Sequence, residues 1–358
     1  MPATYLDWAA TAPLHPSAAH AMAEAALRLQ SGEWANPSSV HAAGRAARRA
    51  LNAARETIAA RLRVPADSIL FTSGGTEALS LALNGADAAP RLVGATEHAA
   101  VLEAAHAART IPVDSSGLVQ LPALPDGALV AVQQANNETG VLQDLAAVAD
   151  AVHAVGGRLV ADCVQSAGKL PLPAAADFIA VSAHKLGGPA GVGALIVRCK
   201  DHFRAQQRGG GQEQGYRGGT ENLIGIIGFA AALEAWDDGF PVRAKALQAR
   251  LEMAAREAGA RINGESVPRL PTITSLHLPG LPAATQLMAL DMAGIAVSQG
   301  AACSSGTLKA SPTLSAMGDP DAAGESLRIS TGWRTTDRDI DHFLAAWRPL
   351  AQRAGHAA

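Results

Sequence analysis

A lysine, Lys185, stands between an apolar run and a glycine-proline turn, in Ser182-Ala183-His184-Lys185-Leu186-Gly187-Gly188-Pro189. The apolar residues 177–181 predict a buried strand, so Lys185 is expected in the loop where that strand ends. The chain has five lysines, at 169, 185, 200, 245 and 309, which leaves few candidates for an amine that condenses with an aldehyde. Desolvation at a strand end favours the neutral, nucleophilic amine. Lys185 is therefore a candidate for a covalent link to an aldehyde cofactor, and a surface lysine on a turn is the alternative.

A carboxylate, Asp162, ends a second apolar strand, and a carboxamide, Gln165, follows three residues later. A buried carboxylate is unfavourable unless it meets a cation, and the protonated ring nitrogen of pyridoxal phosphate is such a cation. The amide of Gln165 could then donate to the phenolic oxygen of the ring. Asp162 taken alone also fits a helix N-cap or an ordinary strand end. Together with Lys185 it indicates a site for pyridoxal phosphate.

Residues 69–78 have the pattern of a strand, a Gly-Gly turn and a helix. Amide hydrogens at a helix start form a binding site for a phosphate group, and Thr76 adds a hydroxyl. Any strand-to-helix connection can need glycine for its backbone angles, so the turn alone is weak support. No Gly-Lys-Ser/Thr follows the turn, and a P-loop is not indicated.

Strand and helix patterns alternate along the first two thirds of the chain, the helices including 41–63, 99–109 and 145–155. Strands are expected at 69–72, 92–95, 128–133, 158–161, 178–182 and 193–197. This alternation predicts an α/β fold with a mainly parallel sheet that is covered on both faces. Ligands of such sheets gather at the carboxyl ends of the strands, where Asp162, Ser182 and His184 fall.

Residues 238–241 separate an expected helix at 222–237 from another at 242–258. We expect a large cofactor-binding domain at 15–241 and a smaller α+β domain made of 1–14 and 242–358. Strands at 275–278 and 327–330 would belong to the smaller domain. The polar stretch 317–326 is expected to be a mobile turn.

Composition argues against several functional classes. The 358 residues are 48% hydrophobic, and the net charge of −3 calls for no nucleic-acid or acidic-membrane partner. Three cysteines without paired or metal-type spacing indicate a reducing compartment and no metal site. The sequence starts without a secretory signal pattern and has no apolar run long enough to span a bilayer, so a cytoplasmic protein is expected.

A series of motifs in a fixed order resembles the cysteine desulfurases, which belong to the class V aminotransferase group of pyridoxal phosphate enzymes. The motifs cover nearly the whole chain: Tyr5 to Asp7, Asn36 to Ser39 with His41, Thr72 to Glu77, Thr96 to His98, Asn136 to Gly140, Asp162 to Gln165, Ser182 to Pro189, Arg217 to Thr220, and Cys303 to Arg328. The resemblance implies the fold type I of pyridoxal phosphate-dependent transferases, with a seven-stranded, mainly parallel sheet in the large domain.

The resemblance also implies contacts to the cofactor ring. Lys185 would carry the covalent link, and Asp162 would pair with the ring nitrogen. Gln165 would bond the phenolic oxygen, while His98 would stack on the ring face and transfer protons. Asn137 would contact both the cofactor and the substrate.

Other positions would bind the two anionic groups of the complex. Gly75, Thr76, Ser182 and His184 would hold the cofactor's phosphate. Thr220 would reach the phosphate of the neighbouring subunit, which implies a homodimer. Arg328, with Asn137, would hold the carboxylate of the substrate.

Cys303 would be the nucleophile, because it lies in a small-residue run at 298–306 that resembles the long cysteine loop of some desulfurases. The implied reaction converts L-cysteine to L-alanine and leaves the sulfur on Cys303 as a persulfide. An acceptor or scaffold protein would then receive it for iron–sulfur cluster, thio-cofactor or tRNA biosynthesis. The chain ends about twenty residues after Arg334, without the longer tail that docks such a scaffold in many relatives. Transfer of the sulfur to a scaffold protein is therefore left open by the sequence. Cys163 and Cys199 are expected to be small buried hydrophobic residues.

Two alternatives remain open at the level of the sequence. One is a related enzyme, a selenocysteine lyase or another class V aminotransferase, although transamination requires no thiol. The other is a catalytically silent binding protein that retains the fold. Retention of Lys185, Asp162, His98 and Cys303 together argues against it.

Overall fold

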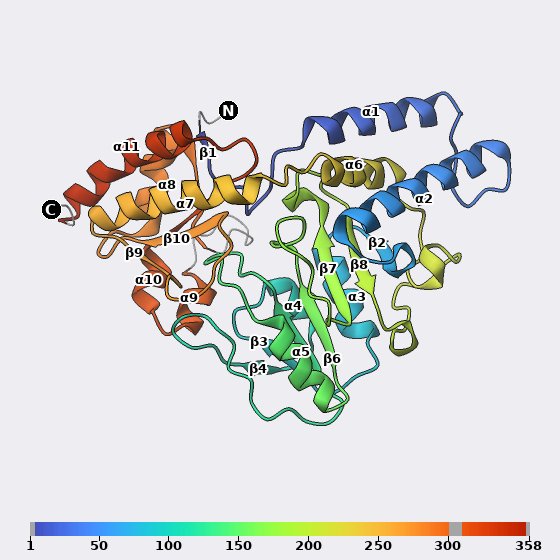
Figure 1. The fold of residues 1–358 in the computed structure, drawn as a ribbon, viewed down its shortest axis with the longest axis horizontal. Helices are drawn as coiled ribbons and strands as arrows, with labels where there is room; N and C mark the ends of the chain where they lie inside the picture. The colour runs from blue at the N-terminus through green and yellow to red at the C-terminus, as the bar shows by residue number, and fades with distance from the viewer. Residues whose placement is uncertain (1–3, 301–309, 356–358) are drawn as a thin grey trace.

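A computed structural model describes residues 4–300 and 310–355, and a seven-stranded sheet organises its larger part (Figure 1). The strand order is β2-β8-β7-β6-β5-β3-β4. The strands are β2 (Ile69–Thr72), β3 (Arg91–Gly94), β4 (Arg109–Ile111), β5 (Leu129–Gln133), β6 (Arg158–Asp162), β7 (Phe178–Ser182) and β8 (Gly193–Val197). β3 to β7 pair in parallel, whereas β8 runs antiparallel to both of its neighbours, β2 and β7. The prediction of a mainly parallel sheet is confirmed.

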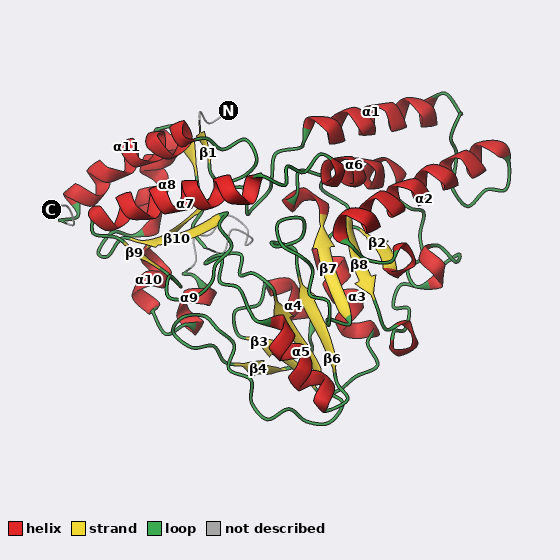
Figure 2. Ribbon diagram, viewed as in Figure 1, coloured by secondary structure: helices red, strands yellow, loops and turns green. Residues whose placement is uncertain are grey.

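Helices cover both faces of this sheet, as continuous apolar strands require (Figure 2). Side chains alternate between the faces, so Ile179 and Val181 belong to one core cluster while Phe178 and Ala180 belong to the other. The first cluster includes buried residues of α2 (Ala42–Leu62), α5 (Leu145–Ala154) and α6 (Leu223–Glu234). The second includes residues of α3 (Gly75–Gly85) and α4 (Ala99–Ala104). A further helix, α1 (Pro16–Gln30), lies along α6 (Figure 1).

A second, antiparallel sheet forms from the last third of the chain, with the order β12-β10-β9. Its strands are β9 (Arg261–Ile262), β10 (Ile273–His277) and β12 (Ser326–Ser330). Its core cluster includes residues of α7 (Phe240–Glu257), α8 (Ala283–Met292) and α11 (Asp337–Arg353), with Trp347 fully buried.

The start of the chain joins this second part. β1 (Thr4–Tyr5) pairs in parallel with β11 (Ile295–Ala296), and Leu6 lies in the second sheet's core cluster. Figure 1 shows β1 beside the C-terminal helices. The domain bounds 15–241 and 1–14 with 242–358 stay a prediction, which the separate core clusters of the two sheets support.

Two local predictions are wrong. The stretch 317–326 is not only a turn, because α10 (Pro320–Glu325) forms there and packs on α9 (Pro312–Ala316). Asp319 accepts a hydrogen bond from the Ala322 amide as N-cap, and buried alanines anchor the helix.

The expected helix at 99–109 ends at Ala104, and Ala107 adopts a positive φ of 58°. The chain turns there so that Arg109–Ile111 can pair with β3.

The described residues also form four single-turn helices: η1 (Ala66–Ser68), η2 (Ala183–Lys185), η3 (Lys200–His202) and η4 (Glu213–Gly215). Within residues 4–300 and 310–355, no helix combines the length and the apolar character needed to cross a membrane.

Candidate active site

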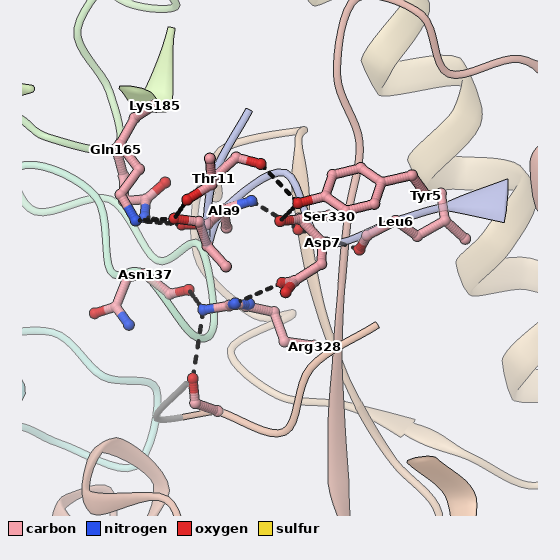
Figure 3. A network of polar contacts seen from close by, with 12 residues as sticks. Tyr5, Leu6, Asp7, Ala9, Thr11, Asn137, Gln165, Lys185, Arg328 and Ser330 are labelled. Carbon is pink, nitrogen blue, oxygen red and sulfur yellow. Dashed lines mark hydrogen bonds and ion pairs between the residues drawn. The ribbon is translucent and has the colours of Figure 1, made fainter. Parts of the chain in front are cut away.

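Lys185 lies at the end of β7, on the single turn η2, as the sequence predicted. Its Nζ donates to the carbonyl oxygens of Ala9, at 2.6 Å, and Ala10, at 2.8 Å (Figure 3). Both carbonyls belong to the loop after β1, so the N-terminal segment holds the amine at the strand ends. A side-chain pattern could not have identified these partners, because the acceptors are backbone atoms.

Asp162 ends the neighbouring strand β6 and is buried. Its Oδ1 accepts a hydrogen bond of 2.9 Å from the Val164 amide, and it makes no ion pair within the described ranges. Burial raises the pKa of this carboxyl group, while the Val164 bond and the charges of His98 and Lys185 act in the opposite direction. The structure therefore brings Asp162, His98 and Lys185 into one electrostatic neighbourhood.

His98 is the N-cap of α4, and its Nδ1 accepts a hydrogen bond of 3.0 Å from the Ala100 amide. An accepting Nδ1 carries no proton, so the neutral ring holds its proton on Nε2.

The preceding residue, Glu97, was given no role from the sequence. Glu97 is buried, and its Oε1 accepts a hydrogen bond from the Gln133 amide. Its Oε2 has no hydrogen-bond partner within residues 4–300 and 310–355. Burial, together with the nearby Asp162, raises the pKa of Glu97 well above its usual range.

The N-terminus of α3 lies against the residues that follow Asp162. Its N-cap, Gly74, offers no side chain, so backbone amides alone form the helix start. A Cβ on Gly75 would lie 2.6 Å from Cγ2 of Val164. A Cβ on Gly74 would lie 3.9 Å from Oγ of Ser182. Gly75, Thr76 and Ser182, predicted to bind a phosphate, thus lie close together.

Two further predicted residues contact the N-terminal segment. Nδ1 of His184 lies 3.2 Å from Oγ1 of Thr11, and burial, aided by the charge of Lys185, lowers the pKa of His184 to about 4. Nε2 of Gln165 donates to the Ala9 carbonyl at 2.9 Å, while its Oε1 is buried and has no hydrogen-bond partner in the described part of the chain. The donor expected to reach a phenolic oxygen is therefore engaged with Ala9 in this structure.

Arg328 reaches into the site from β12 (Figure 3). One Nη pairs with Oδ1 of Asp7 at 2.8 Å, and the other donates to the carbonyls of Asn137, at 3.1 Å, and Gly300, at 3.4 Å. Its Nε is buried and has no hydrogen-bond partner among the residues that the structure describes. Asn137 is joined to Arg328 through its backbone, and Figure 3 shows its side-chain amide outside this network.

Two predicted residues are not brought into this group. Thr220 is exposed in the loop between η4 and α6. Cys303 lies outside the described residues.

Cys163 is fully buried, as predicted, and burial raises the pKa of its thiol. Cys199 is only partly buried, although burial raises its pKa to about 12. Neither thiol is placed or ionised as a nucleophile needs to be.

Lys169 is a neighbour of the site that the sequence did not single out. Its Nζ donates to the Gln165 carbonyl at 2.8 Å, and burial, followed by the charge of Lys185, lowers its pKa to about 7. The only sequence signal was its place among few lysines, just after a small-residue turn.

Within residues 4–300 and 310–355, no cluster of three histidine, cysteine or acidic side chains is arranged to hold a metal ion.

Comparison with known proteins places the chain in a family. The family described as aminotransferase class-V matches residues 4–343. A cysteine desulfurase of Cereibacter sphaeroides is 39% identical over 378 aligned positions, covering 99% of this chain and 97% of that protein. An IscS-like cysteine desulfurase of Mycobacterium tuberculosis is 36% identical, covering 99% of this chain and 98% of its own length.

The fold agrees with this similarity. The X-ray structure of a NifS-like protein from Rickettsia africae superimposes with a TM-score of 0.86 at 30% identity, covering 98% of this chain and 99% of that one. The chain belongs to the aminotransferase class-V family, among its cysteine desulfurases.

Proposed function

We propose that the protein is a pyridoxal phosphate-dependent cysteine desulfurase that converts L-cysteine to L-alanine and keeps the sulfur on Cys303. In the net reaction the substrate's carbon–sulfur bond breaks and its β carbon gains a proton. A sulfur–sulfur bond forms on Cys303, giving a persulfide. The observation that carries the proposal is the position of Lys185 and of the buried carboxylate of Asp162 at neighbouring strand ends, close enough for the charge of Lys185 to act on that carboxylate.

The residues present fit pyridoxal phosphate. Asp162 is a buried carboxylate whose one hydrogen bond comes from a neutral amide, which suits a cationic ring nitrogen. Oε1 of Gln165, which lines the same cavity as Lys185, is a buried polar atom without a hydrogen-bond partner among the residues that the structure describes. The start of α3 supplies amides for a phosphate, and its close packing on Val164 requires glycine at 75.

Each of these side chains would have a separate task. Lys185 would hold the cofactor covalently, and Asp162 would keep its ring nitrogen protonated. Gly75, Thr76, Ser182 and His184 would bind the phosphate, and Gln165 would orient the ring. When bound, pyridoxal phosphate withdraws electrons from the α carbon of an amino acid and so makes its α proton acidic.

The chain's own groups would then move the protons. His98 has Nδ1 fixed as an acceptor of the Ala100 amide, which leaves Nε2 as the atom that can hold or release a proton. Lys185 would be a second base at the same strand ends whenever its amine is neutral. Arg328 would bind the substrate carboxylate through its Nε and through the Nη that now donates to the backbone carbonyl of Asn137. The carboxylate would replace that carbonyl as acceptor, and Asn137 would border the bound substrate.

Cys303 is the thiol best suited to accept the sulfur. The thiolate is the nucleophilic form, and burial strongly disfavours it in Cys163 and Cys199. The sequence around Cys303 is small and polar, which suits a residue that must reach a bound substrate and then an acceptor.

The assembly and pathway belong to the same proposal. Thr220 is exposed, as a residue that serves a neighbouring subunit's phosphate has to be, so we propose a homodimer. The sulfur would pass to an acceptor protein in iron–sulfur cluster, thio-cofactor or tRNA biosynthesis in the cytoplasm.

The experiment that tests the function compares the parent protein with Cys303→Ala and Lys185→Ala while alanine and sulfide are measured together. The parent should release equal amounts of both from L-cysteine in the presence of a reductant. Cys303→Ala should lose sulfide production yet keep the cofactor's visible absorbance and its spectral response to cysteine. Lys185→Ala should lose both activity and the covalent link that borohydride traps.

Other outcomes would contradict the proposal. An aminotransferase would be little affected by Cys303→Ala and would consume a keto acid. A silent binding protein would show neither cofactor absorbance nor alanine. Faster turnover of selenocysteine, with sulfur transfer independent of Cys303, would favour a selenocysteine lyase.

A further inference from the structure

Lys169 and Lys185 line the same small cavity behind the strand ends of β6 and β7. The cavity has about 10 Å³ of space open to the centre of a water molecule, which is room for about one water. Among the described residues, four polar atoms of its lining residues are buried without hydrogen-bond partners: Gln165 Oε1, Thr272 Oγ1, Thr331 Oγ1 and Trp333 Nε1. The cavity is therefore polar and can solvate an amine.

A short chain of hydrogen bonds joins the two lysines. Lys169 Nζ donates to the Gln165 carbonyl at 2.8 Å, and the Gln165 side chain donates to the Ala9 carbonyl at 2.9 Å. Lys185 Nζ donates to that same carbonyl at 2.6 Å. In the described part of the chain, no carboxylate forms an ion pair with Lys169.

Two ammonium groups in one buried cavity repel each other, and each like charge favours the neutral form of its neighbour. The effect is reciprocal, because the same interaction energy enters the titration of both groups. The charge of Lys185 contributes to the lowered pKa of Lys169. By the same interaction, the charge of Lys169 disfavours the protonated form of Lys185.

We propose that Lys169 is a positioning residue that acts through Lys185: its ammonium group shares the cavity and favours the neutral, nucleophilic form of the Lys185 amine. The inference rests on the proposed role of Lys185 as the cofactor lysine. A neutral amine is the form that condenses with an aldehyde, with loss of one water, and the form that takes up a substrate proton.

Three other titratable groups near Lys185 also influence, directly or through Asp162, whether its amine is charged. Asp162 favours its charged form, whereas His184, when protonated, favours the neutral form. His98 acts on the same carboxylate as Lys185. All three remain when Lys169 is changed, so a Lys169 variant isolates a single charge.

The test measures the Lys185 amine itself in the full-length protein from which the cofactor has been removed. A trace of acetic anhydride acylates neutral amines, and mass spectrometry of the Lys185 peptide gives the rate as a function of pH. The variants are Lys169→Met, which removes the charge, and Lys169→Arg, which keeps it. The matched control is Lys245→Met, which removes an exposed lysine on α7.

In the parent, acylation of Lys185 should persist down to neutral pH. In Lys169→Met its midpoint should move to higher pH, so that acylation at neutral pH slows by about tenfold or more, the factor of one pKa unit. Lys169→Arg and Lys245→Met should follow the parent. In the cofactor-loaded protein, the pH midpoint of the visible absorbance of the Lys185 link should move the same way.

The inference is overturned if Lys169→Met follows the parent, or if Lys245→Met shifts the profile equally. A purely structural role of Lys169 would lower stability without moving the midpoint, and circular dichroism at each pH separates that case. Because the acylation assay needs neither cofactor nor cysteine, a protein without desulfurase activity would still answer it.

Discussion

At the scale of single residues, the site is distinguished by two buried carboxylates that form no ion pair with any residue the structure describes. Asp162 and Glu97 are both buried, and burial raises the pKa of both carboxyl groups. The charge of Asp162 raises the pKa of Glu97 further. Such groups are unfavourable in the protein alone, and a bound cation offsets that cost. The sequence identified Asp162 as a strand-end carboxylate but gave Glu97 no role, because burial is not visible in a Thr-Glu-His motif.

Replacing Asp162 by asparagine should weaken the binding of pyridoxal phosphate by at least about 100-fold, because it leaves a ring cation without its partner. The dissociation constant can be measured from visible absorbance during titration with the cofactor. Asp126→Asn, which neutralises an exposed carboxylate, is the control and should bind as the parent does. Equal affinities for Asp162→Asn and the control would remove Asp162 from the site.

Replacing Glu97 by glutamine should stabilise the cofactor-free protein at neutral and higher pH. The pKa of Glu97 is raised by folding, so its stabilising contribution is present at acid pH and is lost as pH rises through the folded-state pKa. The gain in the free energy of unfolding for Glu97→Gln should therefore grow from pH 5 towards pH 8, as urea titrations can measure. A difference that is constant with pH, or a less stable variant at pH 8, would contradict this assignment.

At the scale of elements, the ends of β6 and β7 and the start of α3 bring the predicted residues together. The strands at 69–72, 178–182 and 193–197 were predicted to the residue, because short apolar runs bounded by glycine or polar residues are unambiguous there. The helix at 99–109 was overextended, since its alanine-rich sequence gives no sign that Arg109–Ile111 must complete the sheet edge. The helix α10 was missed because Gly, Asp and Pro are typical both of turns and of short capped helices.

A methyl group at Gly75 tests the close packing of α3 on the loop after Asp162. Gly75→Ala should lower the free energy of unfolding by about 1–3 kcal/mol, because the new Cβ would meet Val164. Adding Val164→Ala should recover much of this loss, since it removes the methyl groups that clash. Urea unfolding of the single and double variants gives the coupling energy.

Gly324 provides the matched control for this substitution. It lies in α10, and a Cβ there would meet nothing within 4 Å. Gly324→Ala should be neutral or slightly stabilising, because alanine favours the helix more than glycine does. Additive effects of Gly75→Ala and Val164→Ala would show that the two residues are not in contact.

At the scale of the whole molecule, the N-terminal segment crosses from one sheet to the other. It pairs with β11, supplies Asp7 to Arg328 and then offers the Ala9 and Ala10 carbonyls to Lys185 (Figure 3). The sequence predicted that the first residues join the smaller part of the protein. It could not predict that backbone atoms of the same segment would contact the lysine, because no residue type encodes a carbonyl contact.

The proposed homodimer predicts complementation between two defective chains. Lys185→Ala lacks the cofactor lysine, and Thr220→Val lacks the hydroxyl offered to the neighbouring subunit. In a hybrid dimer one of the two sites would keep both groups, so random exchange should restore about a quarter of the parental sites. The recovered activity of mixed chains, compared with each variant alone, measures this. Sedimentation as a monomer, or no recovery after verified exchange, would contradict shared sites.

The most direct test of the central claim is to locate the sulfur after a single turnover. The protein is mixed with one equivalent of L-cysteine, persulfides are trapped by alkylation, and every cysteine peptide is weighed by mass spectrometry. We predict one added sulfur atom on the Cys303 peptide, none on those of Cys163 and Cys199, and one alanine released per trapped sulfur. Pyruvate in place of alanine, or sulfur on the buried thiols while Cys303 stays unmodified, would contradict the account.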